Sequence, residues 1–201
     1  MSQDETAARS PGPFLGALLS YQRGADALSE LTGKLAQWIV IPTVVVGFVN
    51  VVLRYSGQLM GERLTSNAII ELQYYMYSVI FLLGFAYVLK HQINVRVDFW
   101  YSSQTLSRKA WIDFVGNWIA LVPFCLIGIW VSSPQALQSI RVGEISPDGG
   151  LPRGPIKALL AISFVLLLIQ AIAEQIRLLA VILDRRHLVA IEEPEEHIRV
   201  E

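Results

Sequence analysis

Long uncharged runs alternate with clusters of polar residues along this chain. The run from Leu72 to Leu89 has eighteen residues without a formal charge. As a helix it would be about 27 Å long, close to the hydrocarbon thickness of a bilayer. Comparable stretches predict membrane spans at about 35–55, 69–90, 111–133 and 156–183. We therefore expect an all-α integral membrane protein with a four-helix transmembrane domain over residues 35–183.

Apolar residues with a helical spacing precede the first span. The ones that fall on one face are Phe14, Leu18, Tyr21, Ala25, Leu28 and Leu35. Their spacing of three, four or seven is typical of an amphipathic helix. We expect residues 1–34 to be a cytoplasmic segment whose helix lies in the membrane interface. The alternative is a lead-in helix that packs against another part of the protein.

Glycine and proline residues shape the second half of the chain. We expect residues 134–156 to form the loop after the third span, because the glycines and prolines between Gly143 and Pro155 favour turns. The candidate residues of this loop, expected on the periplasmic side, are Glu144, Pro147, Asp148, Gly150, Leu151, Pro152 and Lys157. Pro42 and Pro123 lie inside spans and are expected to bend them. Residues 184–201 are expected to form a charged cytoplasmic tail.

Charge and composition predict the orientation and exclude several classes of protein. With four spans, eleven of the 16 lysines and arginines fall on the side of the two termini and five on the other. This excess places both termini in the cytoplasm. The net charge of −1 offers no basic stripe for nucleic acid. The single cysteine, Cys125, excludes an internal disulfide and a multi-thiolate metal site.

Polar residues gather near the ends of the predicted spans. Glu71 is either satisfied by backbone N–H groups at its helix start or in contact with another helix, internal or in a partner. Gln170 needs a hydrogen-bond partner within the protein, and Glu174 is spaced to pair with Arg177. The candidates for contact with a partner are Arg54, Glu71, Gln73, Gln170 and Glu174. A polar cluster at the connection between the second and third spans comprises His91, Asn94, Arg96, Asp98 and Asp113.

The chain lacks the groups that an enzyme or a self-sufficient carrier requires. No span has a formally charged residue near its midpoint, and the three histidines lie outside the spans, which argues against a haem-carrying bundle. No HExxH, GxSxG or P-loop sequence is present. We expect no enzyme activity, no metal site and no cofactor. A homo-oligomeric carrier or channel remains the alternative, with Asn50, Asn117 and Gln170 brought together on assembly.

An ordered series of short motifs runs through the four spans. These are VNVVLRY at 49–55, ELQYY at 71–75, GFAYVLKHQINVRVD at 84–98, GEISPDGGLP at 143–152, and Lys157 followed by LLLIQ at 166–170. In their order and spacing they resemble the small membrane subunit, the Q-type or DctQ-like permease, of TRAP transporters. The resemblance covers roughly residues 35–183.

The resemblance implies a role within a tripartite system of the bacterial inner membrane. In this family a periplasmic binding protein captures an organic acid, and a large M-type permease subunit moves it with sodium by an elevator motion. The small subunit joins the static scaffold of the large one, and sodium belongs to the large subunit. We expect the face with Arg54, Glu71 and Gln73, and the long fourth helix, to grip the large subunit. The 134–156 loop is expected to help receive the binding protein transiently, and membrane lipid to surround the spans.

Overall fold

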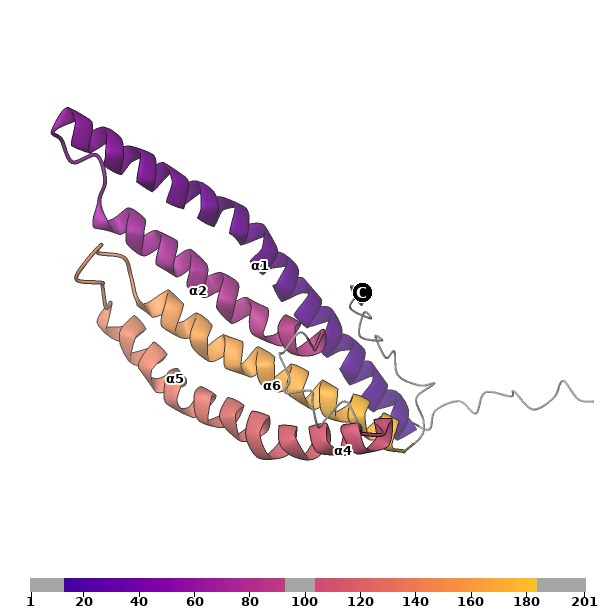
Figure 1. Ribbon diagram of the computed structural model, residues 1–201. Helices are drawn as coiled ribbons and strands as arrows, with labels where there is room; N and C mark the ends of the chain where they lie inside the picture. The colour runs from indigo at the N-terminus through magenta and orange to yellow at the C-terminus, as the bar shows by residue number, and fades with distance from the viewer. Residues whose placement is uncertain (1–12, 93–103, 184–201) are drawn as a thin grey trace, which may run out of the picture.

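The computed structural model describes residues 13–92 and 104–183, which form long helices joined by short connections (Figure 1). Four of these helices are long and apolar enough to cross a membrane. Of the described residues, only Ile145 and Pro152 pair as an isolated β-bridge. The predicted all-α, four-span architecture is therefore confirmed. Asn94, Arg96 and Asp98 of the predicted polar cluster, like the 184–201 tail, lie outside the described residues.

The first helix, α1, is one continuous element from Pro13 to Met60. At 1.5 Å per residue its 48 residues are about 72 Å long. No boundary separates the predicted amphipathic helix from the first span, and the chain stays helical through Pro42. The buried residues of the first half are Leu19, Gln22, Ala25, Ser29, Thr32, Gly33 and Ala36. All but Gly33 follow one another at spacings of three or four. This face packs inside the protein. Of the predicted apolar face it includes Ala25, whereas Tyr21 and Leu35 are 39% and 49% exposed.

The second helix, α2 (Asn67–Lys90), returns beside α1. Two side chains of α2 cover glycines of α1. Gly33 lies against the Tyr87 ring, and Gly47 lies against the Gln73 amide, so closely that an added Cβ would collide with each. Close approach of backbones at small residues is the ordinary way for helices to pack in a membrane.

The third span consists of α4 (Leu106–Gly116), a π-helical turn η1 (Asn117–Leu121) and α5 (Val122–Val142). The π turn directly precedes Pro123, which the sequence predicted as a site of bending. A proline ring clashes with the carbonyl four residues before it and offers that carbonyl no N–H. A π turn, with its wider hydrogen-bonding period, relieves this conflict. In Figure 1 the α4–α5 segment curves around α6.

The prediction that a loop begins at Pro134 is wrong, because α5 continues to Val142. Beyond Pro134, Ala136 and Ser139 are buried, and this packing holds the helix together past the proline. The helix ends at Gly143, whose φ of 63° lies in the left-handed region. Its N–H bonds the carbonyl of Ile140, and the next N–H bonds that of Ser139. This is a Schellman motif, for which glycine is the favoured residue.

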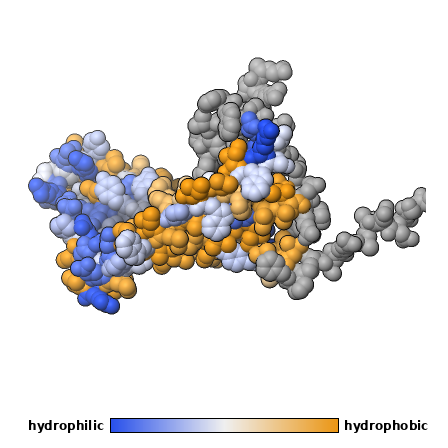
Figure 2. Space-filling model, turned by 90° about the horizontal axis from the view of Figure 1, so that it is seen from below, coloured by the Kyte–Doolittle hydropathy of each residue, from blue (hydrophilic) through white to orange (hydrophobic). Residues whose placement is uncertain are grey.

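The fourth helix, α6 (Gly154–Ile182), is the centre of the bundle. It contacts α1, α2, α4 and α5, whereas α1 and α5 lie at opposite edges of the arrangement (Figure 1). Ser163, Gln170 and Ala171 on α6 are completely buried. In Figure 2 hydrophobic residues form a broad band across the middle of the molecule, and hydrophilic residues gather at the end with the 61–66 and 143–153 connections. This band is the surface expected of a membrane-spanning bundle.

Candidate functional site

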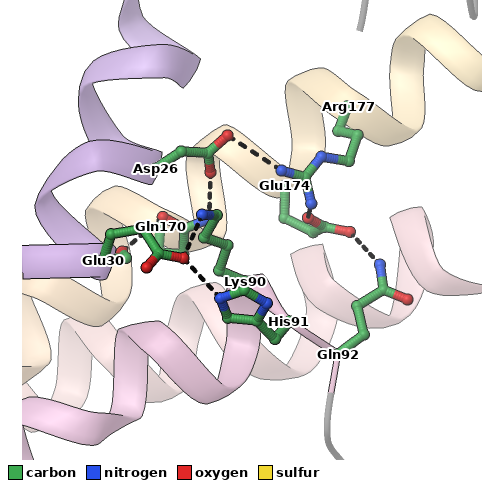
Figure 3. A network of polar contacts seen from close by, with 9 residues as sticks. Asp26, Glu30, Lys90, His91, Gln92, Gln170, Glu174 and Arg177 are labelled. Carbon is green, nitrogen blue, oxygen red and sulfur yellow. Dashed lines mark hydrogen bonds and ion pairs between the residues drawn. The ribbon is translucent and has the colours of Figure 1, made fainter. Parts of the chain in front are cut away.

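Polar side chains of three helices meet at one end of the bundle (Figure 3). We call this group the three-helix network, and its end of the bundle the network end. Its members are Asp26, Ser29 and Glu30 of α1, Lys90, His91 and Gln92 at the end of α2, and Gln170, Glu174 and Arg177 of α6. The network joins residues up to 151 positions apart in the sequence.

Gln170 is the deepest member of the network. Its side chain is completely buried, so its amide requires partners within the protein. Ser29 Oγ donates a hydrogen bond of 2.7 Å to Gln170 Oε1. Gln170 Nε2 in turn donates to Asp26 Oδ1 at 2.9 Å. The prediction that Gln170 finds its partner inside the protein is therefore confirmed, with α1 supplying both groups.

Arg177 connects α6 to α1 and also braces α6 itself. Its guanidinium donates to Glu174 at 3.0 Å, which confirms the predicted pair, and to Asp26 at 3.1 Å. Gln92 reaches the same Glu174 from the end of α2 and donates at 2.7 Å. Gln92 has a φ of 50°, a left-handed conformation in which the chain leaves α2. The buried Glu174 carboxylate thus accepts hydrogen bonds from Arg177 of α6 and from Gln92 at the end of α2.

Glu30 holds the end of α2 against α1. Lys90 Nζ donates to Glu30 Oε1 at 2.6 Å, and His91 Nε2 lies 2.7 Å from the same oxygen. The His91 ring also packs on Tyr87, with ring centroids 4.3 Å apart. His91 therefore serves as one of two donors that fix the last turn of α2.

The residues of the network are those expected of interhelical contacts that stabilise the fold. Three carboxylates face two cationic side chains and His91, and charges buried this deeply are stable only when they are paired. Within residues 13–92 and 104–183, no group of three or more His, Cys, Asp or Glu side chains could hold a metal ion. The network supplies neither an activated nucleophile nor an open ligand position, so its contacts fix the relative positions of α1, α2 and α6.

A second polar cluster surrounds a cleft of about 560 Å³ at the opposite end of the bundle. We call it the loop cleft, and its end of the bundle the loop end. It lies between the first turns of α2 and α6 and the 143–153 loop. Its polar lining residues are Asn67, Glu71, Tyr74, Tyr75, Ser146, Asp148, Arg153 and Lys157, with Ile70 and Ile156 as the apolar ones.

Glu71 fastens the loop to α2. Its carboxylate is 9% exposed, and Oε2 accepts a hydrogen bond of 3.4 Å from the N–H of Leu151. Gly149 lies so close to this carboxylate that a Cβ there would collide with it. Glu71 therefore contacts the loop of its own chain, a partner that neither sequence interpretation named.

Glu144 pairs with both basic residues at the start of α6. Lys157 Nζ donates to Glu144 Oε2, and an Arg153 nitrogen lies 3.6 Å from Oε1. The hydrogen bond from Lys157 lowers the pKa of the Glu144 carboxyl from its ordinary value of 4.5. The loop residues Pro147, Asp148, Gly150 and Pro152 are exposed, whereas Leu151 is half-buried.

The remaining predicted site residues are not among the named members of either cluster. Arg54 is exposed on α1, and Gln73 packs on Gly47. Asp113 is half-buried on α4. The structure thus brings together Gln170 and Glu174, and separately Glu71, Asp148 and Lys157.

Sequence reasoning missed the α1 half of the network. The apolar pattern that predicts the amphipathic helix does not single out Asp26, Ser29 or Glu30. A signal was present in the sequence, since Asp26 lies three residues before Ser29 and four before Glu30, which places both beside it on the helix surface. On α6, Gln170, Glu174 and Arg177 follow one another at four and three residues and also share one face.

Apolar helices with charges confined to two ends define a multi-pass membrane protein. Residues 14–181 match the family model for the DctQ component of tripartite ATP-independent periplasmic transporters, and the chain belongs to this family. The resemblance drawn from the sequence motifs is confirmed, and the family is that of a transporter component rather than an enzyme. Comparisons with curated proteins and with solved structures gave no match.

Proposed function

We propose that this chain is the small subunit that scaffolds the large permease of a sodium-coupled importer of organic acids. It lies in the bacterial inner membrane with both termini cytoplasmic, and a periplasmic binding protein docks transiently at the loop end. Family membership supports the place in a tripartite transporter. Sodium coupling and the organic acid follow from the motif resemblance, and sodium binds in the large subunit. The short loop end, with fewer basic residues, faces the periplasm.

The observation that carries the scaffold role is the absence of charge between the two clusters. Within the described helices no charged residue lies between Lys34 and Arg54, between Glu71 and Lys90, between Asp113 and Arg141, or between Lys157 and Glu174. The buried hydroxyls of Thr43, Ser132 and Ser163 each bond a carbonyl of their own helix. A path for an ion or an organic anion requires polar groups at the midplane, so transport belongs to the partner.

The edge helix α1 supplies the surface for the large subunit. The large apolar residues that follow one line along it, which we call the α1 stripe, are Trp38, Ile41, Val45, Phe48, Val52, Tyr55 and Leu59. They are spaced alternately by three and four residues, the pattern that packs one helix against another. All are exposed in this chain, Trp38 by 73% and Leu59 by 90%. Arg54 lies beside the stripe near its loop end.

The other predicted partner contacts make bonds within the chain. Gln170 and Glu174 belong to the three-helix network, and Glu71 binds the loop. These residues support the subunit interface by holding the helices in place. The homo-oligomeric carrier needs Gln170 at a surface between copies, whereas Gln170 is completely buried and its amide is bonded at both ends.

Affinity purification of the tagged chain from mildly solubilised native membranes tests the proposal. A large permease recovered at equal stoichiometry supports it, and recovery of only this chain contradicts it. The stripe is tested by Trp38→Ala with Ile41→Ala, which should abolish recovery of the large permease. A matched control is Trp130→Ala with Ile127→Ala on the other edge helix, whose side chains are 76% and 59% exposed. Loss only with the α5 variant would move the interface to α5, and retention with both would exclude the stripe.

A further inference from the structure

We propose that the loop cleft binds the headgroup of a zwitterionic phospholipid with a primary ammonium, of the phosphatidylethanolamine type. The proposal needs the chain to lie in a membrane but does not depend on its pairing with a large permease. Three features of the cleft support it. These are a cationic side with free donors, an acidic side, and an exposed apolar track that descends from the cleft along α2.

The cationic side suits a phosphate group. Arg153 and Lys157 line the cleft with side chains that are 40% and 33% exposed. Arg153 lies 3.6 Å from Glu144, beyond hydrogen-bond length, so its donors remain available to a further anion. The first turns of α2 and α6 both line the cleft, and neither helix has a side-chain hydrogen bond at its N-cap. Their uncapped N–H groups add positive potential at the same place.

The acidic side excludes a simple anion as the best occupant. Glu71 and Asp148 also line the cleft, and Glu144 pairs with both of its cations. The cleft therefore has no excess of positive charge. A free anion would be repelled by these carboxylates. A zwitterion can place its phosphate near the basic side chains and its ammonium near the acidic ones. The exposed Asp148 suits an ammonium group, whose three N–H donors a carboxylate can accept. A trimethylated ammonium has no N–H donor, and this favours ethanolamine over choline.

An apolar track on α2 leads from the cleft into the hydrophobic band. It consists of Ile70, Tyr74, Tyr77 and Phe81, at spacings of four, three and four. Tyr74, Tyr77 and Phe81 are 67%, 56% and 67% exposed. From the first to the last residue the track is about 16 Å long, close to the thickness of one bilayer leaflet. Tyrosine rings suit the boundary between headgroups and acyl chains. An acyl chain on this track places its phosphate at the cleft.

Native mass spectrometry of the purified full chain tests the proposal. The delipidated protein is mixed in turn with dioleoyl phosphatidylethanolamine, phosphatidylcholine or phosphatidylglycerol at equal concentration. We expect one phosphatidylethanolamine to be retained preferentially over the other two lipids. Arg153→Gln combined with Lys157→Gln should weaken its retention roughly tenfold, the effect of losing charge-assisted hydrogen bonds. Asp148→Asn should remove the preference for phosphatidylethanolamine over phosphatidylcholine and leave the binding of phosphate-bearing lipid intact.

The control is Arg141→Gln, which removes an exposed cation at the end of α5 that does not line the cleft. It should leave retention unchanged. Equal retention of the three lipids, or equal loss in the control and the cleft variants, would overturn the proposal and leave only non-selective annular lipid. Stronger retention of phosphatidylglycerol would identify an anion site instead. Each result is independent of whether a large permease is recovered, so failure of this proposal and failure of the scaffold role are distinguishable.

Discussion

The two ends of the bundle use the same kinds of charged residue for different purposes. At the network end, the side chains of Glu174 and Arg177 are 4% and 10% exposed. They pair with each other, and each also bonds a residue of another helix, Gln92 and Asp26 respectively. At the loop end, the side chains of Arg153 and Lys157 are 40% and 33% exposed around an open cleft. Burial makes internal pairing obligatory, whereas partial exposure leaves donors available to a ligand. The degree of burial, more than the residue types, therefore distinguishes the structural role of the three-helix network from the ligand-binding role proposed for the loop cleft.

Replacement of one arginine at each end is the strongest test of this comparison. Arg177→Met should destabilise the protein by about 3 to 5 kcal/mol, because the buried Glu174 and the partly buried Asp26 lose their cationic partner. Arg153→Met should cost less than about 1 kcal/mol, since its ion pair is half-exposed and long. Thermal unfolding in lipid-free detergent measures both. Equal effects of the two substitutions would show that the ends do not differ in the way described.

Removal of the central amide of the network should have a smaller effect. Gln170→Leu keeps a similar volume but leaves Ser29 Oγ without its acceptor and Asp26 with Arg177 as its remaining partner. We expect a cost of about 1 to 3 kcal/mol. Gln135→Leu, at an exposed position on α5, is the matched control and should stay within about 0.5 kcal/mol. Chemical unfolding of the two variants gives the comparison. A neutral Gln170→Leu would mean that packing alone holds α1 against α6.

The loop end should show the smallest effect, and it should depend on pH. The folded-state pKa of Glu144 is lowered by its bond from Lys157, so the pair contributes stability above the unfolded pKa of about 4.5. This contribution is lost as pH falls through the folded pKa. Glu144→Gln should therefore unfold at a slightly lower temperature than the native chain at pH 7. The difference should shrink as the pH falls below 4.5 and vanish below the folded-state pKa. A difference that grows on acidification would contradict this assignment.

Periodicity and run length were sufficient to predict the helices but not all of their limits. The second and fourth spans, predicted at 69–90 and 156–183, lie in helices Asn67–Lys90 and Gly154–Ile182. The loop predicted from Pro134 was wrong because proline is a local signal. The packing of Ala136 and Ser139 against the rest of the bundle outweighs that signal. Such tertiary packing cannot be read from the sequence alone. Gly143, by contrast, ends α5 through its own backbone conformation.

Pairing across the fold was harder to predict than pairing along a helix. The Glu174–Arg177 contact could be predicted because three residues on a helix define a distance. The contact of Asp26 with Gln170 joins positions 144 residues apart and depends on how α1 and α6 are placed against each other. The contact of Glu71 with Leu151 depends likewise on the path of a loop. Only the need of Gln170 for an internal partner followed from its position in an apolar run.

Because α1 is one continuous helix, the faces of its two halves have a fixed rotation relative to each other about the helix axis. Each residue of an α-helix turns the chain by about 100°. Because the helix is continuous between Asp26 and Tyr55, no loop there can compensate for an added or removed residue. The network fixes the rotation of the first half about its axis, and the packing of Gly47 against Gln73 fixes that of the second half. Together they determine the direction in which the stripe points. One residue inserted near Lys34 would swing the stripe by more than a quarter turn and leave every side chain in it intact. The number of residues between the network and the stripe therefore determines which side of the bundle the stripe faces.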